Sequence, residues 1–89
     1  MKSHYLEVTY RKGKPFAAYL HLGHDAGARC DASRKIAPGL VADYGTDGRP
    51  VGLEIVSPTA VSLADIKAAI RKLRISPVSD AELAPLKAA

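Results

Sequence analysis

One pair of residues, Asp47 and Gly48, constrains the fold of this chain more than any other feature. An Asp-Gly pair is favoured at the tip of a β-hairpin because both residue types tolerate the positive φ that tight turns require. Segments rich in apolar residues lie on either side, at 40–44 and 51–56. The connection between them is longer than two residues, so we predict an extended or bulged hairpin loop. Pro50 suits the first position of the returning strand.

Two further segments alternate between apolar and polar residues with the period of a half-buried strand. They span residues 4–10 and 16–22, and a turn rich in Gly and Pro at 11–15 separates them. Residues 28–36 are more polar and alternate weakly, which is typical of an exposed edge strand. The sequence therefore predicts four or five short strands.

The apolar period changes from that of a strand to that of a helix after the hairpin. Ser62 and Asp65 have the spacing of a capping box. We predict a helix from about 63 to 74, ended by Pro77. Its apolar stripe consists of Leu63, Ile66, Ile70 and Leu73.

The last residues contain a second capping pattern, from Ser79 to Glu82. Pro85 follows closely and cannot continue a helix. We therefore expect only a short turn of helix before the tail frays.

Size and composition fit a single folded domain. The chain has 89 residues, of which 47% are hydrophobic and 25% charged. We predict an α+β fold, a small antiparallel sheet with one amphipathic C-terminal helix packed on it. Within a domain spanning 1–89, the sheet occupies 4–60, the helix 62–75 and a short C-terminal extension 76–89. The sheet is expected to meet the helix with Leu6, Val8, Leu20, Leu53 and Ile55.

Cysteine content and hydropathy indicate the compartment. The single cysteine, Cys30, cannot form a disulfide within its own chain. The first residues lack the apolar run of a signal peptide, and no window approaches the length of a membrane span. On these grounds we expect a cytoplasmic protein of a bacterium, with no membrane contact.

The residues around the hairpin resemble a small bacterial family catalogued as DUF2283, a domain of unknown function. The likeness rests on Leu-Val-Ala-Asp-Tyr at 40–44, the Asp-Gly-Arg turn, Val-Gly-Leu-Glu-Ile at 51–55 and Ala-Ala-Tyr-Leu-His-Leu at 17–22. It covers roughly residues 5–60. The motif positions that carry it are Asp43, Asp47, Gly48, Gly52 and Glu54.

Two departures limit what the resemblance implies. Phe16 stands where family members often have an acidic residue, and the predicted helix extends beyond the usual family core. The family has no established activity. Some members resemble the antitoxin half of small toxin–antitoxin gene pairs, so the resemblance implies inhibition of a partner protein by direct contact.

Weak candidates for a metal site cluster after the second strand. His21, His24 and Asp25 lie within five residues, and His4 is in reach across the first hairpin. A metal site needs three or four such ligands converging on one point. Histidines exposed at a turn explain the same residues, so we expect no metal and no cofactor.

Asp43 and Glu54 lie on the paired strands of the hairpin and are candidates to face each other. Two close carboxylates raise one pKa, as acid–base chemistry sometimes requires. A solvated face neutralised by Arg34 or Arg49 explains the pair equally well. Without a catalytic constellation, we expect no enzyme activity.

The helix carries a basic stripe. Lys67, Arg71 and Arg74 have a spacing that places them on one side of a helix. Together with a formal net charge of +4, such a stripe suits a phosphate backbone, although an ordinary solvated helix face has the same pattern. Nucleic-acid binding is therefore an alternative function.

The leading interpretation is a non-enzymatic protein-interaction module, antitoxin-like in the sense of the resemblance. An exposed β-edge at 28–36 can accept a strand from a partner such as a small toxin. A small metal- or ligand-binding protein is a further alternative. Because one helix covers only part of one sheet face, we also predict a homodimer that protects Tyr5, Tyr19 and Val56.

Overall fold

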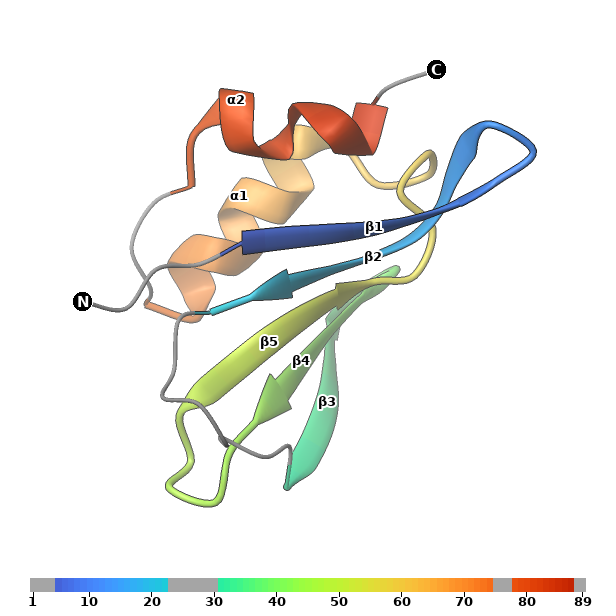
Figure 1. Ribbon diagram of the computed structural model, residues 1–89. Coiled ribbons are helices and arrows are strands. Elements are labelled where there is room, and N and C mark those ends of the chain that lie inside the picture. Colours follow the sequence, from blue (N-terminus) through green and yellow to red (C-terminus); the bar gives the residue numbers. More distant parts are fainter. Residues whose placement is uncertain (1–4, 23–30, 75–77, 88–89) are drawn as a thin grey trace.

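The computed structural model describes residues 5–22, 31–74 and 78–87. These residues form an antiparallel five-stranded sheet with helices packed on one face (Figure 1), which confirms the predicted α+β fold. The elements are β1 Tyr5–Arg11, β2 Lys14–His21, β3 Ala32–Ala37, β4 Leu40–Tyr44, β5 Pro50–Ile55, α1 Leu63–Lys72, α2 Asp80–Leu83 and the 3-10 helix η1 Ala84–Lys87.

The strands are arranged in the order β1-β2-β5-β4-β3. Two local units, the β1–β2 hairpin and the β3–β4–β5 meander, join where β2 pairs with β5, with Leu20 opposite Leu53. The strands at the two edges are β1 and β3. The expected edge strand is thus confirmed over Ala32–Ala37, whereas the first part of its predicted span falls outside the described residues.

The hairpin around Asp47 and Gly48 forms as predicted, with a bulged loop. Gly48 has a φ of 81°, and its N–H donates to the carbonyl of Gly45. Asp47 does not have a positive φ. Instead, its Oδ1 accepts the backbone N–H of Arg49 at 3.0 Å. Asp47 therefore favours the turn through a side-chain hydrogen bond, and only the glycine supplies the left-handed conformation.

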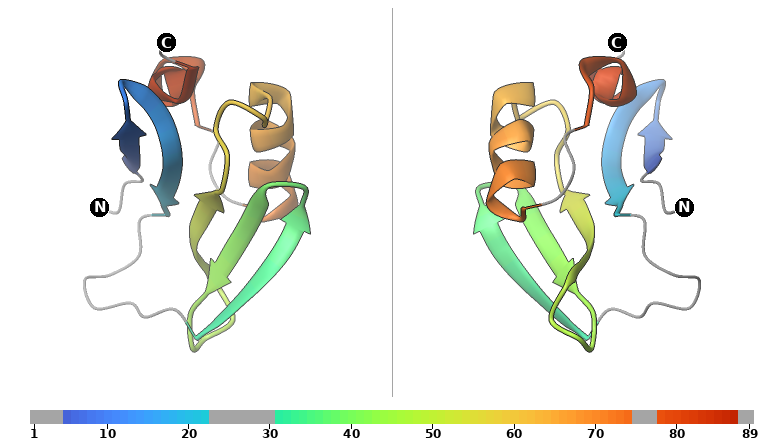
Figure 2. Two further views of the ribbon diagram at one scale, coloured as in Figure 1. Left: turned by 90° about the vertical axis from the view of Figure 1, so that its right-hand side faces the viewer. Right: turned by 90° about the vertical axis from the view of Figure 1, so that its left-hand side faces the viewer.

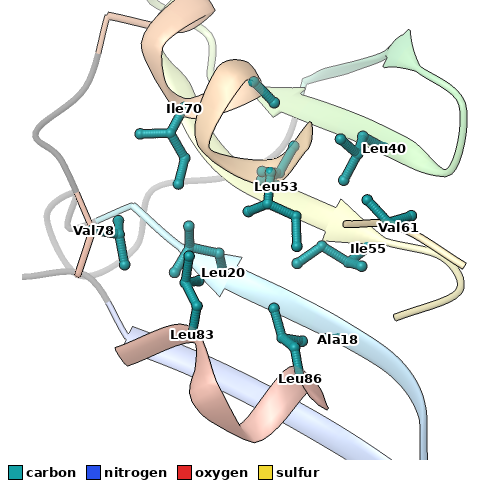
Figure 3. Packing of buried hydrophobic residues seen from close by; sticks show 12 residues of the cluster. Ala18, Leu20, Leu40, Leu53, Ile55, Val61, Ile70, Val78, Leu83 and Leu86 are labelled. Atoms are coloured by element: carbon teal, nitrogen blue, oxygen red, sulfur yellow. The ribbon is translucent and has the colours of Figure 1, made fainter. Parts of the chain in front are cut away.

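The hydrophobic core lies between the sheet and α1. Ile66 and Ile70 of the predicted stripe are buried, and Leu63 and Leu73 are half-buried. Figure 3 shows the side chain of Ile70 between α1 and the sheet. The sheet contributes the residues expected from its alternation: Leu20, Leu53 and Ile55 are buried, and Leu6 and Val8 are half-buried.

Helix α1 begins at the predicted position and ends slightly earlier than predicted. Ser62 Oγ accepts the N–H of Asp65 at 3.0 Å, which caps the first turn. The last helical residue is Lys72, and Arg74 has a φ of 58°. A left-handed residue closes the last turn of many helices, so local capping ends α1 before Pro77, which lies outside the described residues.

The predicted short turn of helix after Ser79 forms, but the predicted fraying is wrong for residues 84–87. Ser79 and Glu82 form both halves of a capping box, and α2 continues directly into η1. Leu83 and Leu86 are fully buried and point toward β2 (Figure 3), and Val78 is also buried. The views in Figure 2 show α2 next to the β1–β2 hairpin, a part of the sheet that α1 does not cover.

Candidate functional site

The face of the sheet turned away from the helices, here called the outer face, carries a line of polar and aromatic side chains. The strand registers place Tyr5 opposite His21, His21 opposite Gly52, Gly52 opposite Asp43, and Asp43 opposite Ser33. Every strand thus contributes one position to this line. The sheet therefore brings together residues that are widely separated in the sequence.

Tyr19 lies across Gly52 on the outer face. A Cβ atom added at Gly52 would overlap the hydroxyl and ring of Tyr19, so only glycine allows the ring to occupy this position. The Tyr19 hydroxyl donates to Asp43 Oδ2 at 2.8 Å, and Ser33 Oγ donates to Asp43 Oδ1 at 2.7 Å. The Asp43 carboxylate thereby connects β2, β4 and β3 through side chains.

His21 belongs to the same cluster. Its ring stacks on Tyr5 at 4.2 Å between centroids and meets the ring of Tyr19 edge-on at 4.7 Å. His21 Nε2 lies 2.7 Å from Glu7 Oε1. The cluster described by these contacts is therefore built from aromatic packing and hydrogen bonds.

The predicted metal ligands are only partly described. His21 lies on β2, whereas His24 and Asp25 fall outside the described residues. Among the residues that the structure describes, no three His, Cys, Asp or Glu side chains are grouped to hold a metal ion. The structure brings His21 to Glu7, and a metal site that includes His24 and Asp25 stays a prediction.

Asp43 and Glu54 lie on the outer face but are not directly opposite. Asp43 pairs with Gly52, and Glu54 pairs with Val41, so the two carboxylates are diagonal neighbours. Asp43 is half-buried and accepts two hydroxyl donors, whereas Glu54 is exposed. This arrangement uses Asp43 as a hydrogen-bond acceptor that holds the sheet face together.

The predicted basic stripe divides between helix and loop. Lys67 forms an ion pair with Asp80 at the start of α2. Arg71 is exposed in the last turn of α1, and Arg74 follows the helix in a left-handed conformation. One of the three cations is therefore paired within the chain, and nucleic-acid binding by this stripe stays a prediction.

Edge strand β3 pairs with β4 along one side, and the register shows which way its backbone is directed at Lys35. Residues of an antiparallel pair direct their N–H and C=O alternately to one side and the other. The Val56 N–H donates to the Gly39 carbonyl, so the backbone of Gly39 is directed toward β5. Because this direction alternates along β4, the backbone of Ala42 is directed toward β3. Arg34 lies opposite Ala42 and faces β4, so its neighbour Lys35 directs its backbone away from β4.

A hollow of about 360 Å³ lies beside the end of β3, next to α1. The residues that line it are mainly apolar, and Asp65 and Lys72 are the charged ones. Figure 2 shows that α1 stands next to the β3–β4 turn at this end of the sheet. The remaining lining residues are Ile36, Ala37, Pro38, Ala60, Ala68 and Ala69. The apolar run at 36–38 and the alanines of α1 were visible in the sequence, but their proximity was not.

A comparison with protein-family models matches residues 17–57 of this chain. The match is to DUF2283, a protein of unknown function. This confirms the resemblance, although the matched segment is shorter than the predicted 5–60. The DUF2283 segment contains β3–β5 and most of β2, whereas β1 and the helices lie outside it. No curated protein and no solved structure matches the chain.

The DUF2283 motif residues have structural roles. Asp47 and Gly48 shape the hairpin loop, and Gly52 accommodates the ring of Tyr19 that donates to Asp43. Sequence reasoning identified Gly52 and Asp43 but missed Tyr19 and Ser33 as their partners.

Within the described ranges, no helix has the length and apolar character needed to cross a membrane.

Proposed function

We propose that this chain is a non-enzymatic protein-interaction module that binds an extended segment of another protein as an additional strand at β3. The observation that carries the proposal is the position of this edge strand beside an apolar hollow. Strand addition uses backbone hydrogen bonds for affinity and nearby pockets for specificity. The edge of β3 would supply the backbone hydrogen bonds, and the hollow would supply the pocket.

The partner is proposed to be a different protein because β3 is poorly suited to pair with itself. Arg34 and Lys35 are consecutive and exposed near the middle of the strand. In an antiparallel pair of two β3 strands, these cations would lie next to their copies, and like charges at such positions are destabilising. The charges of this edge therefore disfavour a second copy and favour a strand of other composition.

The predicted homodimer would have to use another surface, such as the outer face. Tyr5 is 59% exposed on this face, which favours its burial against a second copy of the chain. The exposed Glu54, however, lies in the middle of the same face. Burying that carboxylate without a cation would be costly. Light scattering coupled to size-exclusion chromatography tests the dimer directly, and a monomeric mass would refute it.

An antitoxin-like role is the specific form of this function that the DUF2283 resemblance implies. In that case, the added strand would come from a small toxin. A gene for a small protein next to the gene for this chain, and formation of a complex by the two products, would support this role. Independent folding and no association of the two products would count against it.

The experiment for strand addition compares two substitutions at Lys35. Lys35→Pro removes the outward backbone N–H without touching a hydrogen bond to β4, and Lys35→Gln removes the same charge but retains the N–H. Each variant is used as bait in extracts of the native host, after circular dichroism has shown equal thermal stability.

A partner retained by the wild type and Lys35→Gln, but lost from Lys35→Pro, supports the proposal. Slower hydrogen exchange at β3 in the purified complex is the expected second result. A partner that binds all three baits equally, or leaves β3 exchange unchanged, would show that binding occurs elsewhere.

A further inference from the structure

We infer that the segment added at β3 carries an apolar side chain that enters the hollow next to α1, and that two consecutive acidic residues beside it meet Lys35 and Arg34. The inference rests on the proposed strand addition and specifies the chemistry of the partner. Two observations carry it: the composition of the hollow and the charge of the edge.

The hollow lies on the inner side of the sheet, where the side chains of an additional strand would point. Alternate residues of a strand face the same side, so every second residue of the added segment would be directed toward α1. The two walls include Ile36 of β3 and Ala68 and Ala69 of α1. The small alanine side chains leave room, and an aliphatic side chain would replace water against apolar atoms.

The charges along the edge favour an acidic segment. Arg34 and Lys35 are exposed in β3, and Lys72 lies at the rim of the hollow. Asp31 before β3 and Asp65 at the start of α1 oppose them, so cations outnumber anions along this edge. Arg34 and Lys35 point to opposite sides of the sheet because they are consecutive in a strand. Acidic residues on both sides of the added segment would therefore find a cation.

The pattern also sets the order of these residues in the partner. A residue next to Ile36 would face inward toward the hollow, whereas its neighbours along the added strand would lie next to Lys35 and then Arg34. One apolar residue adjacent to two acidic residues satisfies all three positions. Opposite charges across neighbouring strands stabilise such a pairing, and the apolar residue provides the anchor.

The experiment uses synthetic peptides as probes and fluorescence anisotropy as the readout. The first peptide contains Val-Glu-Glu between threonines. The second peptide has Lys in place of both Glu residues, and the third has Ala in place of Val. Ala68→Phe fills the hollow from an exposed position of α1, and Ala81→Phe makes the same change at an exposed position of α2 away from it. Thermal melting establishes that both variants are folded.

The acidic peptide is expected to bind the wild type about tenfold more tightly than either of the other two. Ala68→Phe should weaken its binding by a similar factor, and Ala81→Phe should not change it. In the double variant Arg34→Glu with Lys35→Glu, the preference should shift from the acidic peptide to the lysine peptide.

Equal binding of the three peptides, no binding of any of them, or no effect of Ala68→Phe would overturn the inference. The Lys35→Pro variant separates this failure from failure of the proposed function. Peptide binding that lacks charge preference but is lost in Lys35→Pro would refute only the partner chemistry. Binding that survives Lys35→Pro would refute strand addition itself.

Discussion

The contact between Tyr19 and Gly52 predicts a specific dependence of stability on a single methyl group. In Gly52→Ala, the new Cβ would occupy the space of the Tyr19 hydroxyl and ring. The backbone itself tolerates alanine because Gly52 does not have a positive φ. The expected cost therefore comes from displacement of the Tyr19 ring and loss of its 2.8 Å hydrogen bond to Asp43.

The magnitude follows from two opposing contributions. Loss of a hydrogen bond to a charged group costs about 1.5–3 kcal/mol, and replacing a strand glycine with alanine contributes about 0.5–1 kcal/mol of stability. The net expected loss is about 0.5–2.5 kcal/mol. This is a substantial part of the roughly 4–13 kcal/mol expected for a domain of this size.

Urea denaturation of a double-mutant cycle measures this effect. Without the Tyr19 ring, in the Tyr19→Ala background, Gly52→Ala should be neutral or stabilising, which corresponds to a coupling energy of about 1.5–3 kcal/mol. If Gly52→Ala costs the same free energy of unfolding in both backgrounds, the contact does not explain the glycine. The reasoning about the outer face would then be refuted.

Three further predictions concern the C-terminal elements. Leu86→Ala should lower the free energy of unfolding by about 2–5 kcal/mol in urea denaturation, because this side chain is fully buried; an unchanged midpoint would show that the tail is not part of the core. Ser79→Ala should cost about 0.5–2 kcal/mol by removing the oxygen that accepts from Glu82, and thermal denaturation showing no loss would contradict this. Asp80→Asn should cost less than about 1 kcal/mol, because the ion pair with Lys67 is solvent-exposed. This last difference should shrink as salt is raised, and a difference independent of salt would argue against an electrostatic origin.

The DUF2283 resemblance and the hairpin were predictable because both depend on residues that are close in the sequence. Asp47 and Gly48 are adjacent, and the hydrogen bond from Arg49 to Asp47 spans two residues. The outer-face cluster was only partly predictable. Tyr19 and Asp43 are 24 residues apart, and their hydrogen bond exists only because β2 and β4 both flank β5.

The C-terminal tail also shows that local sequence patterns predict helix starts but not the packing of the chain that follows. Ser79 and Glu82 correctly predicted a helix start, since a capping box is a local structure. Pro85 led to the wrong expectation of fraying. It lies in the 3-10 turn η1, which places Leu86 in the core rather than ending the ordered chain.

The sequence by itself determined the local elements: the alternation of β1 and β2, the loop at Gly48, the start of α1 at Leu63 and its apolar stripe. Steric preferences, turn chemistry and apolar periodicity act over a few residues, so they can be inferred from neighbours in the chain. Only the tertiary structure decided the pairing of β2 with β5, the ring of Tyr19 across Gly52, and the hollow between β3 and α1. These features depend on how whole elements pack to bury apolar surface, and many arrangements satisfy the same local patterns.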